Sequence, residues 1–268
     1  MTALLSGVHP PIASHAVWPG WCQLLRDSPW SRLATAESGL CAVTLQFDEQ
    51  QYRPGDLDRQ AFDPPPALCR AAPKRQAEFL AGRLCAGEAI RQLRGITSFP
   101  AVQADGAPLW PPQMRGSITH SAGIAMSVVG DSARYGSIGL DVEAVQNHTE
   151  ARSLTGLVLT PDEQKRHQAA LTANPGLCLT RIFSLKEALF KALYPLTRQR
   201  FYFQDAEVLS LNPTGISRMR LLINLSADWP GGSEADAWLT LWQQRVVALV
   251  LTGSEPALIE KVLPGQGH

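Results

Sequence analysis

Apolar and polar residues alternate at positions 138–143, which read Ile-Gly-Leu-Asp-Val-Glu. Successive side chains of a β-strand point to opposite faces, so the three aliphatic residues would share one face. Asp141 and Glu143 would then project together from the other face, where Gly139 leaves room beside them. The pattern predicts a strand that carries two neighbouring carboxylates.

The same kind of pattern predicts further strands and helices along the chain. Apolar runs predict a short strand that ends at Thr119 and strands at residues 40–47, 124–129, 201–209, 216–225, 237–243 and 246–252. Helical spacing of apolar residues predicts helices from Pro73 to about residue 93, from Thr160 as N-cap to Ala173, and over residues 181–193. Gly176 is expected to separate the last two helices.

The order of these elements predicts a fold of two halves. The hairpin at residues 239–253 faintly repeats the pattern at 117–130. We therefore expect an α/β (α+β) fold, a pseudo-dimer of two similar α/β halves in which each half is a small antiparallel sheet packed with helices. The expected halves are residues 1–140 and 141–268, with an active site in the cleft between them.

Composition limits the class of protein further. The chain has 268 residues, 45% of them hydrophobic, and 24 basic against 24 acidic side chains. This balance gives no general case for nucleic acid or an anionic membrane as partner. The five cysteines are scattered and fit a reducing compartment, and residues 1–18 lack the features of a signal peptide. No run is long enough for a membrane span, so a cytoplasmic protein is expected, and the two similar halves in one chain predict a monomer.

Candidate chemistry begins with the two carboxylates on the strand at 138–143. Side by side, Asp141 and Glu143 repel each other unless a proton or a cation lies between them. Hard oxygen ligands of this kind suit Mg²⁺, which usually takes one or two protein carboxylates. A solvated acidic face is the alternative explanation.

The helix at 181–193 places Glu187 and Lys191 on one face, four residues apart. Two structural explanations remain open for these residues. Residues 184–187 fit a capping box, and Glu187 with Lys191 fits an ordinary ion pair on a helix.

Three basic residues upstream are candidates for phosphate binding. Arg75 and Arg83 lie close to one face of the first long helix and could together hold a phosphate, although a solvated face has the same appearance. His120 falls at a strand end beside small residues, where a ligand could approach. A hydrogen-bonded loop histidine explains it equally.

Together these segments resemble the 4′-phosphopantetheinyl transferase superfamily, in its Sfp-type branch that includes enterobactin-synthase component D-like proteins. Residues 139–143 match the G-x-D-x-E strand of that family, and residues 183–191 match its W/F-x-x-K-E-A-x-x-K helix. Further ordered blocks lie at residues 74–83, 108–111, 116–120, 195–197 and 203–206. The resemblance covers roughly residues 74–206 and leaves the first 40 residues unmatched.

The resemblance implies transfer of the 4′-phosphopantetheine arm of coenzyme A to a serine hydroxyl of a carrier protein, with release of 3′,5′-ADP. It implies Mg²⁺, with Mn²⁺ as an alternative, held by Asp141, Glu143 and Glu187. Lys191 would contact the same phosphates, and Glu187 is the candidate base for the serine. Whether Glu187 acts as base, as metal ligand or as both stays open.

For coenzyme A, the resemblance assigns Arg75, Arg83 and His120 to the adenosine 3′-phosphate, with Thr119 beside them. It also implies that Lys186 and Phe201 line the nucleotide or pantetheine path and that Asp141, Glu187 and Lys191 contact coenzyme A. The chain departs from the family at residues 102–105, Val-Gln-Ala-Asp, where relatives often carry lysines.

The implied partner is an apo acyl or peptidyl carrier protein, a small acidic domain for which Arg198 and Arg200 would offer a basic rim. No nucleic acid and no stable membrane insertion are expected. Two rival functions remain: another Mg²⁺-dependent enzyme of phosphoester chemistry, such as a phosphohydrolase or nucleotidyltransferase, and a catalytically silent module that binds carrier proteins. The presence of all three acids and Lys191 favours the transferase.

Overall fold

The computed structural model of the chain describes residues 18–30, 38–59, 64–213 and 215–253. The N-terminal stretch for which no signal peptide is expected lies almost wholly outside these residues. Within them, no helix combines the length and the apolar character needed to cross a bilayer.

The first sheet is antiparallel and has the strand order β1-β2-β6-β5. Its strands are β1 (Cys22–Leu24), β2 (Leu40–Phe47), β5 (Met114–Ser121) and β6 (Ile124–Asp131). The long helix α3 (Pro73–Arg94) packs against one face. The smaller elements of this part are α1 (Gly55–Asp58), α2 (Pro66–Cys69) and the paired strands β3 (Ala101–Val102) and β4 (Pro108–Leu109).

The second sheet is also antiparallel and has the order β7-β11-β10-β9-β8. Its strands are β7 (Ser137–Ala144), β8 (Ala206–Ser210), β9 (Ile216–Leu221), β10 (Glu234–Trp242) and β11 (Arg245–Thr252). Helix α7 (Pro175–Thr197) covers one face, as α3 does in the first sheet. The helices α4 (His148–Val158) and α6 (Gln168–Ala173) lie beside α7, α5 (Pro161–Arg166) packs against α6 and β8, and the 3₁₀ turn η2 (Phe203–Asp205) packs against α4 and β8.

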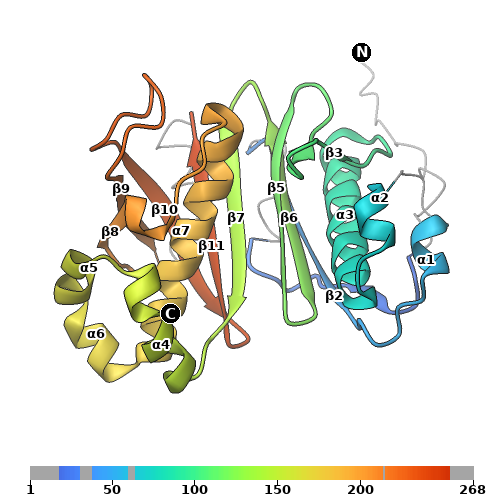
Figure 1. Cartoon of the computed structure of the whole chain (residues 1–268). Helices are drawn as coiled ribbons and strands as arrows, with labels where there is room; N and C mark the ends of the chain where they lie inside the picture. Colours follow the sequence, from blue (N-terminus) through green and yellow to red (C-terminus); the bar gives the residue numbers. More distant parts are fainter. Residues whose placement is uncertain (1–17, 31–37, 60–63, 214, 254–268) are drawn as a thin grey trace, which may run out of the picture.

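The two sheets face each other, with α3 and α7 on the outside (Figure 1). One core lies between α3 and the first sheet, and another lies between α7 and the second sheet. A third core joins the sheets through alternate residues of their strands, including Met126, Leu140 and Leu249. The expected α+β class is confirmed, since each sheet has its own long helix. The predicted boundary at residue 140 falls inside β7, with which the second sheet begins.

Strands β5 and β7, each at the edge of its sheet, lie side by side at the centre of the molecule (Figure 1). The backbone N–H groups of β7 on this side donate to side-chain hydroxyls of β5. Leu140 N, for example, donates to Ser117 Oγ at 3.0 Å. The sheets therefore meet through side chains, and the ladder of each sheet ends at its own edge strand.

Several predicted element boundaries are wrong. The strand predicted at 201–209 begins only at Ala206, because the carboxylate of Asp205 accepts from Tyr202 N at 2.7 Å and closes a tight turn. The strand predicted at 216–225 ends at Leu221. The helix from the N-cap Thr160 is interrupted at His167, whose buried ring hydrogen-bonds the carbonyl of Val208 at 3.0 Å.

Gly176 does not separate two helices, as the sequence had predicted, but lies in the first turn of α7. Asn174 caps this helix by accepting a hydrogen bond from Leu177 N at 3.0 Å. A side chain at position 176 would collide with the carbonyl oxygen of Gln146. The glycine permits close packing of the helix start.

Candidate active site

The acidic strand β7 turns its two carboxylates toward helix α7. Asp141 is only 2% exposed, and three side chains surround it. Lys191 Nζ lies 2.6 Å from Oδ1, Ser184 Oγ donates to Oδ2 at 2.8 Å, and Thr119 Oγ1 lies 3.3 Å from Oδ1. The aliphatic residues of β7 face the other sheet, as the alternation predicts.

Glu143 and Glu187 complete an acidic cluster around Asp141. Ser121 Oγ donates to Glu143 Oε2 at 3.0 Å. Burial, and then the charge of Asp141, raise the pKa of Glu143 to about 7. Burial also raises the pKa of Glu187, and Lys191 partly opposes this shift. Both carboxyl groups thus lie where an additional positive charge would stabilise their ionised forms.

Helix α7 settles the two structural explanations left open for its motif. Ser184 is in the middle of the helix and donates to Asp141, so it caps nothing. Lys191 forms its ion pair with Asp141 on β7. The four-residue spacing therefore serves a contact between α7 and β7, because Glu187 and Lys191 stand one turn apart above the acidic strand.

A cavity of about 690 Å³ lies between α3, the β3–β4 turn, β5 and α7. Its charged lining is mainly cationic and includes Arg75, Arg83, Arg115, Lys191 and Arg200; His120 also lines it. Apolar lining comes from residues such as Phe79 and Trp110. A cavity with this lining suits a ligand that combines negative charge with a flat or apolar group.

Arg83 is 5% exposed, and its Nη1 has no hydrogen-bond partner among the described residues. Its guanidinium lies over the ring of Phe79, 4.9 Å from the ring centre. Burial lowers the pKa of Arg83 to about 10, so the group stays charged at neutral pH. A buried cation with an unmet donor favours an anionic ligand.

His120 lies on the α3 side of β5, with Nε2 3.1 Å from Arg75 Nη1. A guanidinium can only donate, so this ring nitrogen accepts. Burial lowers the pKa of His120, and Glu78 partly opposes the shift. Thr119 points to the opposite side of the strand and touches Asp141 and Lys191. The expected position of Thr119 beside the 3′-phosphate therefore remains a prediction.

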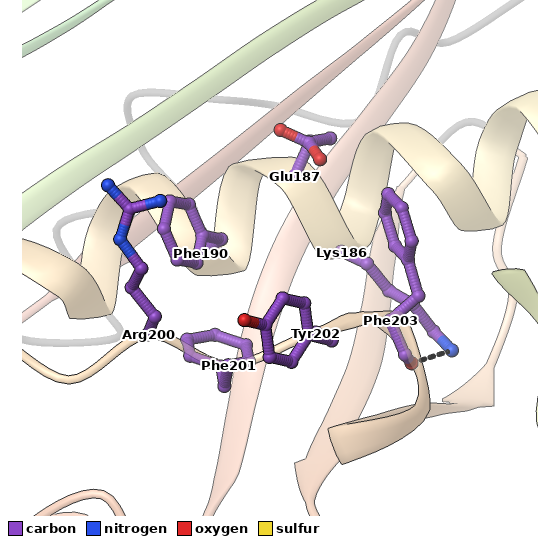
Figure 2. A pocket seen from close by; sticks show the side chains of 7 residues that line it. All are labelled: Lys186, Glu187, Phe190, Arg200, Phe201, Tyr202 and Phe203. Atoms are coloured by element: carbon purple, nitrogen blue, oxygen red, sulfur yellow. Dashed lines mark hydrogen bonds between the residues drawn. The ribbon is translucent and has the colours of Figure 1, made fainter.

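A smaller cavity of about 190 Å³ adjoins the large one, since Phe190 and Arg200 line both. Its other lining residues are Lys186, Glu187, Phe201, Tyr202 and Phe203 (Figure 2). The ring centres of Phe190 and Phe201 lie 5.4 Å apart, and the two rings form an aromatic wall. Phe201 thus lines this smaller cavity, where a slender apolar group would fit.

Lys186 lines the smaller cavity with its stem, while its amine is buried away from Glu187 (Figure 2). The amine donates to Glu163 Oε2 at 2.6 Å and to the carbonyl oxygens of Val158 and Phe203 at 2.8 and 2.7 Å. With three acceptors in place, the amine has no free donor for a ligand. This geometry favours a supporting role, and the implied contact of Lys186 with coenzyme A stays a prediction.

Comparison with known proteins decides the family. Residues 63–130 match the 4′-phosphopantetheinyl transferase N-terminal domain, and residues 137–250 match the 4′-phosphopantetheinyl transferase superfamily model. Enterobactin synthase component D of Salmonella typhimurium is 35% identical over 179 residues, which are 65% of this chain and 70% of that protein. The chain belongs to the 4′-phosphopantetheinyl transferase superfamily.

Other transferases of this superfamily are similarly related to the chain. The 4′-phosphopantetheinyl transferase Svp of Streptomyces mobaraensis is 31% identical over 205 residues, 75% of this chain and 81% of the relative. The 4′-phosphopantetheinyl transferase PptT of Mycobacterium tuberculosis is 35% identical over 165 residues, 59% of this chain and 70% of the relative. The family predicted from the sequence motifs is confirmed. The predicted enzyme class, a transferase that uses coenzyme A as substrate, is confirmed as well.

The chemistry of phosphopantetheinyl transferases implies a divalent cation, and the acidic cluster offers candidate ligands for it. Asp141, Glu143 and Glu187 are hard oxygen donors, and the pKa values of the two glutamates are raised first by burial and also by the charge of Asp141. No group of three such side chains in the described residues is already arranged as a metal cage. Because Mg²⁺ usually binds through one or two carboxylates plus water and phosphate oxygens, the donor set still fits this ion.

Sequence reasoning missed several residues that shape the site. Ser121 and Ser184 hold the carboxylates, Glu163 holds Lys186, and Tyr194 holds the β3–β4 turn. These are long-range contacts, for which a single sequence carries little signal. The i,i+2 spacing of Thr119 and Ser121 is the exception, since it places both hydroxyls on one face of a strand.

Proposed function

We propose that this transferase moves the 4′-phosphopantetheine arm of coenzyme A to a serine hydroxyl of an apo acyl or peptidyl carrier protein and releases 3′,5′-ADP. The observation that carries the proposal is the junction of the two cavities. The larger one is mainly cationic and includes Lys191 in its lining, the smaller one is aromatic and includes Glu187, and Phe190 and Arg200 line both. Coenzyme A has the matching form, a phosphorylated nucleotide joined through a diphosphate to a slender arm.

In this arrangement Arg75, Arg83 and His120 would bind the adenosine 3′-phosphate. The unpartnered Nη1 of Arg83 supports this assignment, since a phosphate oxygen would meet its unfilled donor. The arm would lie along the aromatic wall at Phe190 and Phe201. A nucleotide in the large cavity and an arm in the small one would bring the diphosphate to Lys191.

Glu187 is our candidate for the general base. Glu187 lines the smaller cavity, and burial raises the pKa of its carboxyl, as suits a general base. The serine oxygen would attack the phosphorus that carries the arm, and its proton would pass to Glu187. The bond from that phosphorus to the 3′,5′-ADP oxygen breaks, and Lys191 would stabilise the charge that develops there.

Asp141 and Glu143, with Glu187 from α7, would hold Mg²⁺ or Mn²⁺. When bound, such a cation supplies electrostatic stabilisation of the diphosphate as it is cleaved. Lys191 lies at 2.6 Å from Asp141 Oδ1 and would balance part of the acidic charge on this strand. The division of Glu187 between base and metal ligand stays open.

We further propose that residues 1–140 form the adenosine-phosphate side and residues 141–268 the catalytic side of the cleft between the halves. The carrier protein would dock on the catalytic side. Arg200 lines both cavities and remains our candidate for a basic rim toward an acidic partner. Arg198 is already paired with Asp105 at 3.2 Å, which makes it the weaker candidate.

The names of the relatives suggest the pathway class. Several are enterobactin synthase components, so carrier proteins of siderophore, nonribosomal-peptide or polyketide synthesis are the first substrates to try, with fatty-acid carriers beside them. We propose a cytoplasmic monomer, with no nucleic-acid partner and no stable membrane insertion. All five cysteines are free thiols, which fits a reducing compartment.

The direct test is the intact mass of a carrier protein. Apo carrier, coenzyme A and Mg²⁺ are incubated with the wild type, Asp141→Ala or Glu187→Ala. A gain of one phosphopantetheine arm that disappears in EDTA and in both variants supports the proposal. Hydrolysis of coenzyme A without transfer would favour a phosphohydrolase. Binding of coenzyme A with no mass gain on several unrelated carriers would favour a silent carrier-binding module.

A further inference from the structure

A row of hydroxyls on β5 runs beside the acidic strand β7. Ser117, Thr119 and Ser121 alternate along β5 and therefore share one face. Their oxygens accept hydrogen bonds from successive alternate N–H groups of β7: Leu140 N at 3.0 Å, Val142 N at 3.3 Å and Ala144 N at 3.4 Å. The hydroxyls thus satisfy the free edge of β7 in place of a neighbouring backbone.

Two of these hydroxyls also donate to the carboxylates. Thr119 Oγ1 lies 3.3 Å from Asp141 Oδ1, and Ser121 Oγ lies 3.0 Å from Glu143 Oε2. Each of them therefore binds the backbone of one β7 residue and the side chain of the residue before it. By the same rule Ser117 accepts from Leu140 N and stands opposite Gly139, which has no side chain.

We infer that Thr119 and Ser121 are positioning residues that fix the orientation of the two carboxylates for a divalent cation. Two like charges two residues apart on a strand would otherwise rotate away from each other. A hydroxyl anchored to the backbone of β7 can hold each carboxylate toward its neighbour. Hydrogen bonds to a ligating carboxylate orient it and strengthen the site, as partners of metal ligands generally do.

This inference deepens the proposed function and rests on its cation site. It means that the first sheet builds part of a site whose acidic ligands lie on the second sheet and on its helix α7. Separation of β5 from β7 would then break the hydrogen bonds to both carboxylates and thereby weaken the cation site.

The test measures binding of Mn²⁺ by electron paramagnetic resonance, with and without coenzyme A and without any carrier protein. The variants are Ser121→Ala and Thr119→Val, and Ser117→Ala is the matched control because it loses a β7 N–H bond but no carboxylate contact. Ser121→Thr keeps the hydroxyl. We expect the Kd for Mn²⁺ to rise by about tenfold or more in the first two variants.

The same experiment separates positioning from general stability. We expect Ser117→Ala to change the Kd by less than about twofold and to lower the melting temperature as much as Ser121→Ala does, while Ser121→Thr restores the affinity. Equal Kd values for Ser121→Ala, Thr119→Val and Ser117→Ala would overturn the inference. They would leave the proposed function intact if the wild type binds Mn²⁺ and loads the carrier. If the wild type binds no Mn²⁺ under either condition, the cation site and the inference both fail.

Discussion

The hydroxyl of Tyr194 donates a hydrogen bond to Oδ2 of Asp105 over 2.8 Å and so ties helix α7 to the turn between β3 and β4. Arg198 Nη1 binds the same oxygen at 3.2 Å. Asp105 Oδ1 accepts from Ala107 N at 3.0 Å, which fixes the turn. Asp105 and Tyr194 both line the large cavity. The Asp105 carboxylate thus fastens the β3–β4 wall of the cavity to helix α7.

We expect Tyr194→Phe to loosen this wall and to raise the Kd for coenzyme A by about two- to tenfold, the usual effect of one hydrogen bond. Titration calorimetry with coenzyme A measures the change, and kcat should stay close to the wild-type value. Asp105→Ala should give a similar loss, and the double variant should add nothing to either. Tighter binding in Asp105→Ala would mean that the acidic charge repels the ligand and that the tie is unimportant.

The ion pair of Lys186 and Glu163 leads to a prediction about stability. Their side chains are 2% and 0% exposed, so Lys186→Met leaves a carboxylate buried without its partner. We expect this variant to lose about 3–5 kcal/mol in free energy of unfolding, measured by chemical denaturation. Lys165→Met removes an exposed pair in the same region, 80% and 73% exposed, and should change stability by less than about 0.5 kcal/mol.

The affinity for coenzyme A of folded Lys186→Met tests the role implied by family resemblance. If the amine only supports the fold, as its three protein acceptors indicate, affinity should remain near the wild-type value. A large loss of affinity in protein that is still folded would place the amine on the ligand.

Local patterns explain what the sequence could predict. The alternation at 138–143 determines which side chains share a face, so the common direction of Asp141 and Glu143, opposite to the aliphatic residues, followed from it. Spacing on a helix likewise placed Glu187 and Lys191 together. Thr160 with Glu163 forms the N-terminal capping box of α5, which confirms the predicted N-cap at Thr160.

Contacts between distant segments explain what the sequence could not predict. The helix from Thr160 breaks at His167 because a carbonyl on β8 binds its ring. The acceptors of Lys186 come from α4, α5 and η2, and no spacing rule connects them. The start of helix α4 could have been predicted, because asparagine is a common N-cap residue. In the structure the Asn147 side chain caps this helix by accepting from Glu150 N at 2.9 Å.

The lack of a side chain at Gly139 allows the backbone of α7 to pack closely against the acidic strand. A Cβ at this position would overlap the carbonyl oxygen of Ala188 and lie 2.6 Å from Ala192 N, both in the backbone of α7. Gly139→Ala should therefore push the helix away, lower the free energy of unfolding by about 1–3 kcal/mol and reduce the rate of carrier loading. Denaturation and the mass assay measure the two effects.

Gly156 in α4 supplies the control, because a Cβ there meets no atom within 4 Å. Gly156→Ala should raise stability by about 0.5–1 kcal/mol through better helix formation. Unchanged stability and activity in Gly139→Ala would show that α7 can move without harm to the site.

The pKa of Glu143, raised to about 7 by burial first and by Asp141 second, predicts a pH dependence of the metal-free protein. A raised carboxyl pKa means that the native state holds a proton that the unfolded state has already lost. The stability from this group is fully present below the ordinary value of 4.5 and is lost as pH rises through about 7. Thermal unfolding from pH 4.5 to 8 should show this decline in the wild type.

Glu143→Gln removes the titrating group and should reduce that decline in stability. Part of the decline should remain, because burial raises the pKa of Glu187 in the same direction. Addition of Mn²⁺ should stabilise the wild type most at the alkaline end, since a cation competes with the proton. The same stability profile in the wild type and in Glu143→Gln would contradict the assignment.

Arg83 leads to opposite expectations for stability and for binding. Its guanidinium is 5% exposed and leaves Nη1 without a partner in the described part of the chain, so the charge lowers the stability of the ligand-free protein. Arg83→Met keeps the apolar stem and should raise the melting temperature of that protein. It should also raise the Kd for coenzyme A by about 10- to 100-fold, the usual range for a hydrogen bond to a charged group.

The assignment of Arg83 to the 3′-phosphate is tested with dephospho-coenzyme A, which lacks only that group. Arg83→Met should bind this ligand as the wild type does, so that the variant loses the preference for the 3′-phosphate. Arg91→Met is the control on the same helix, since Arg91 pairs with Glu88 at 2.7 Å and does not line the cavity. An equal loss of affinity for both ligands would instead place Arg83 at the diphosphate, closer to Lys191.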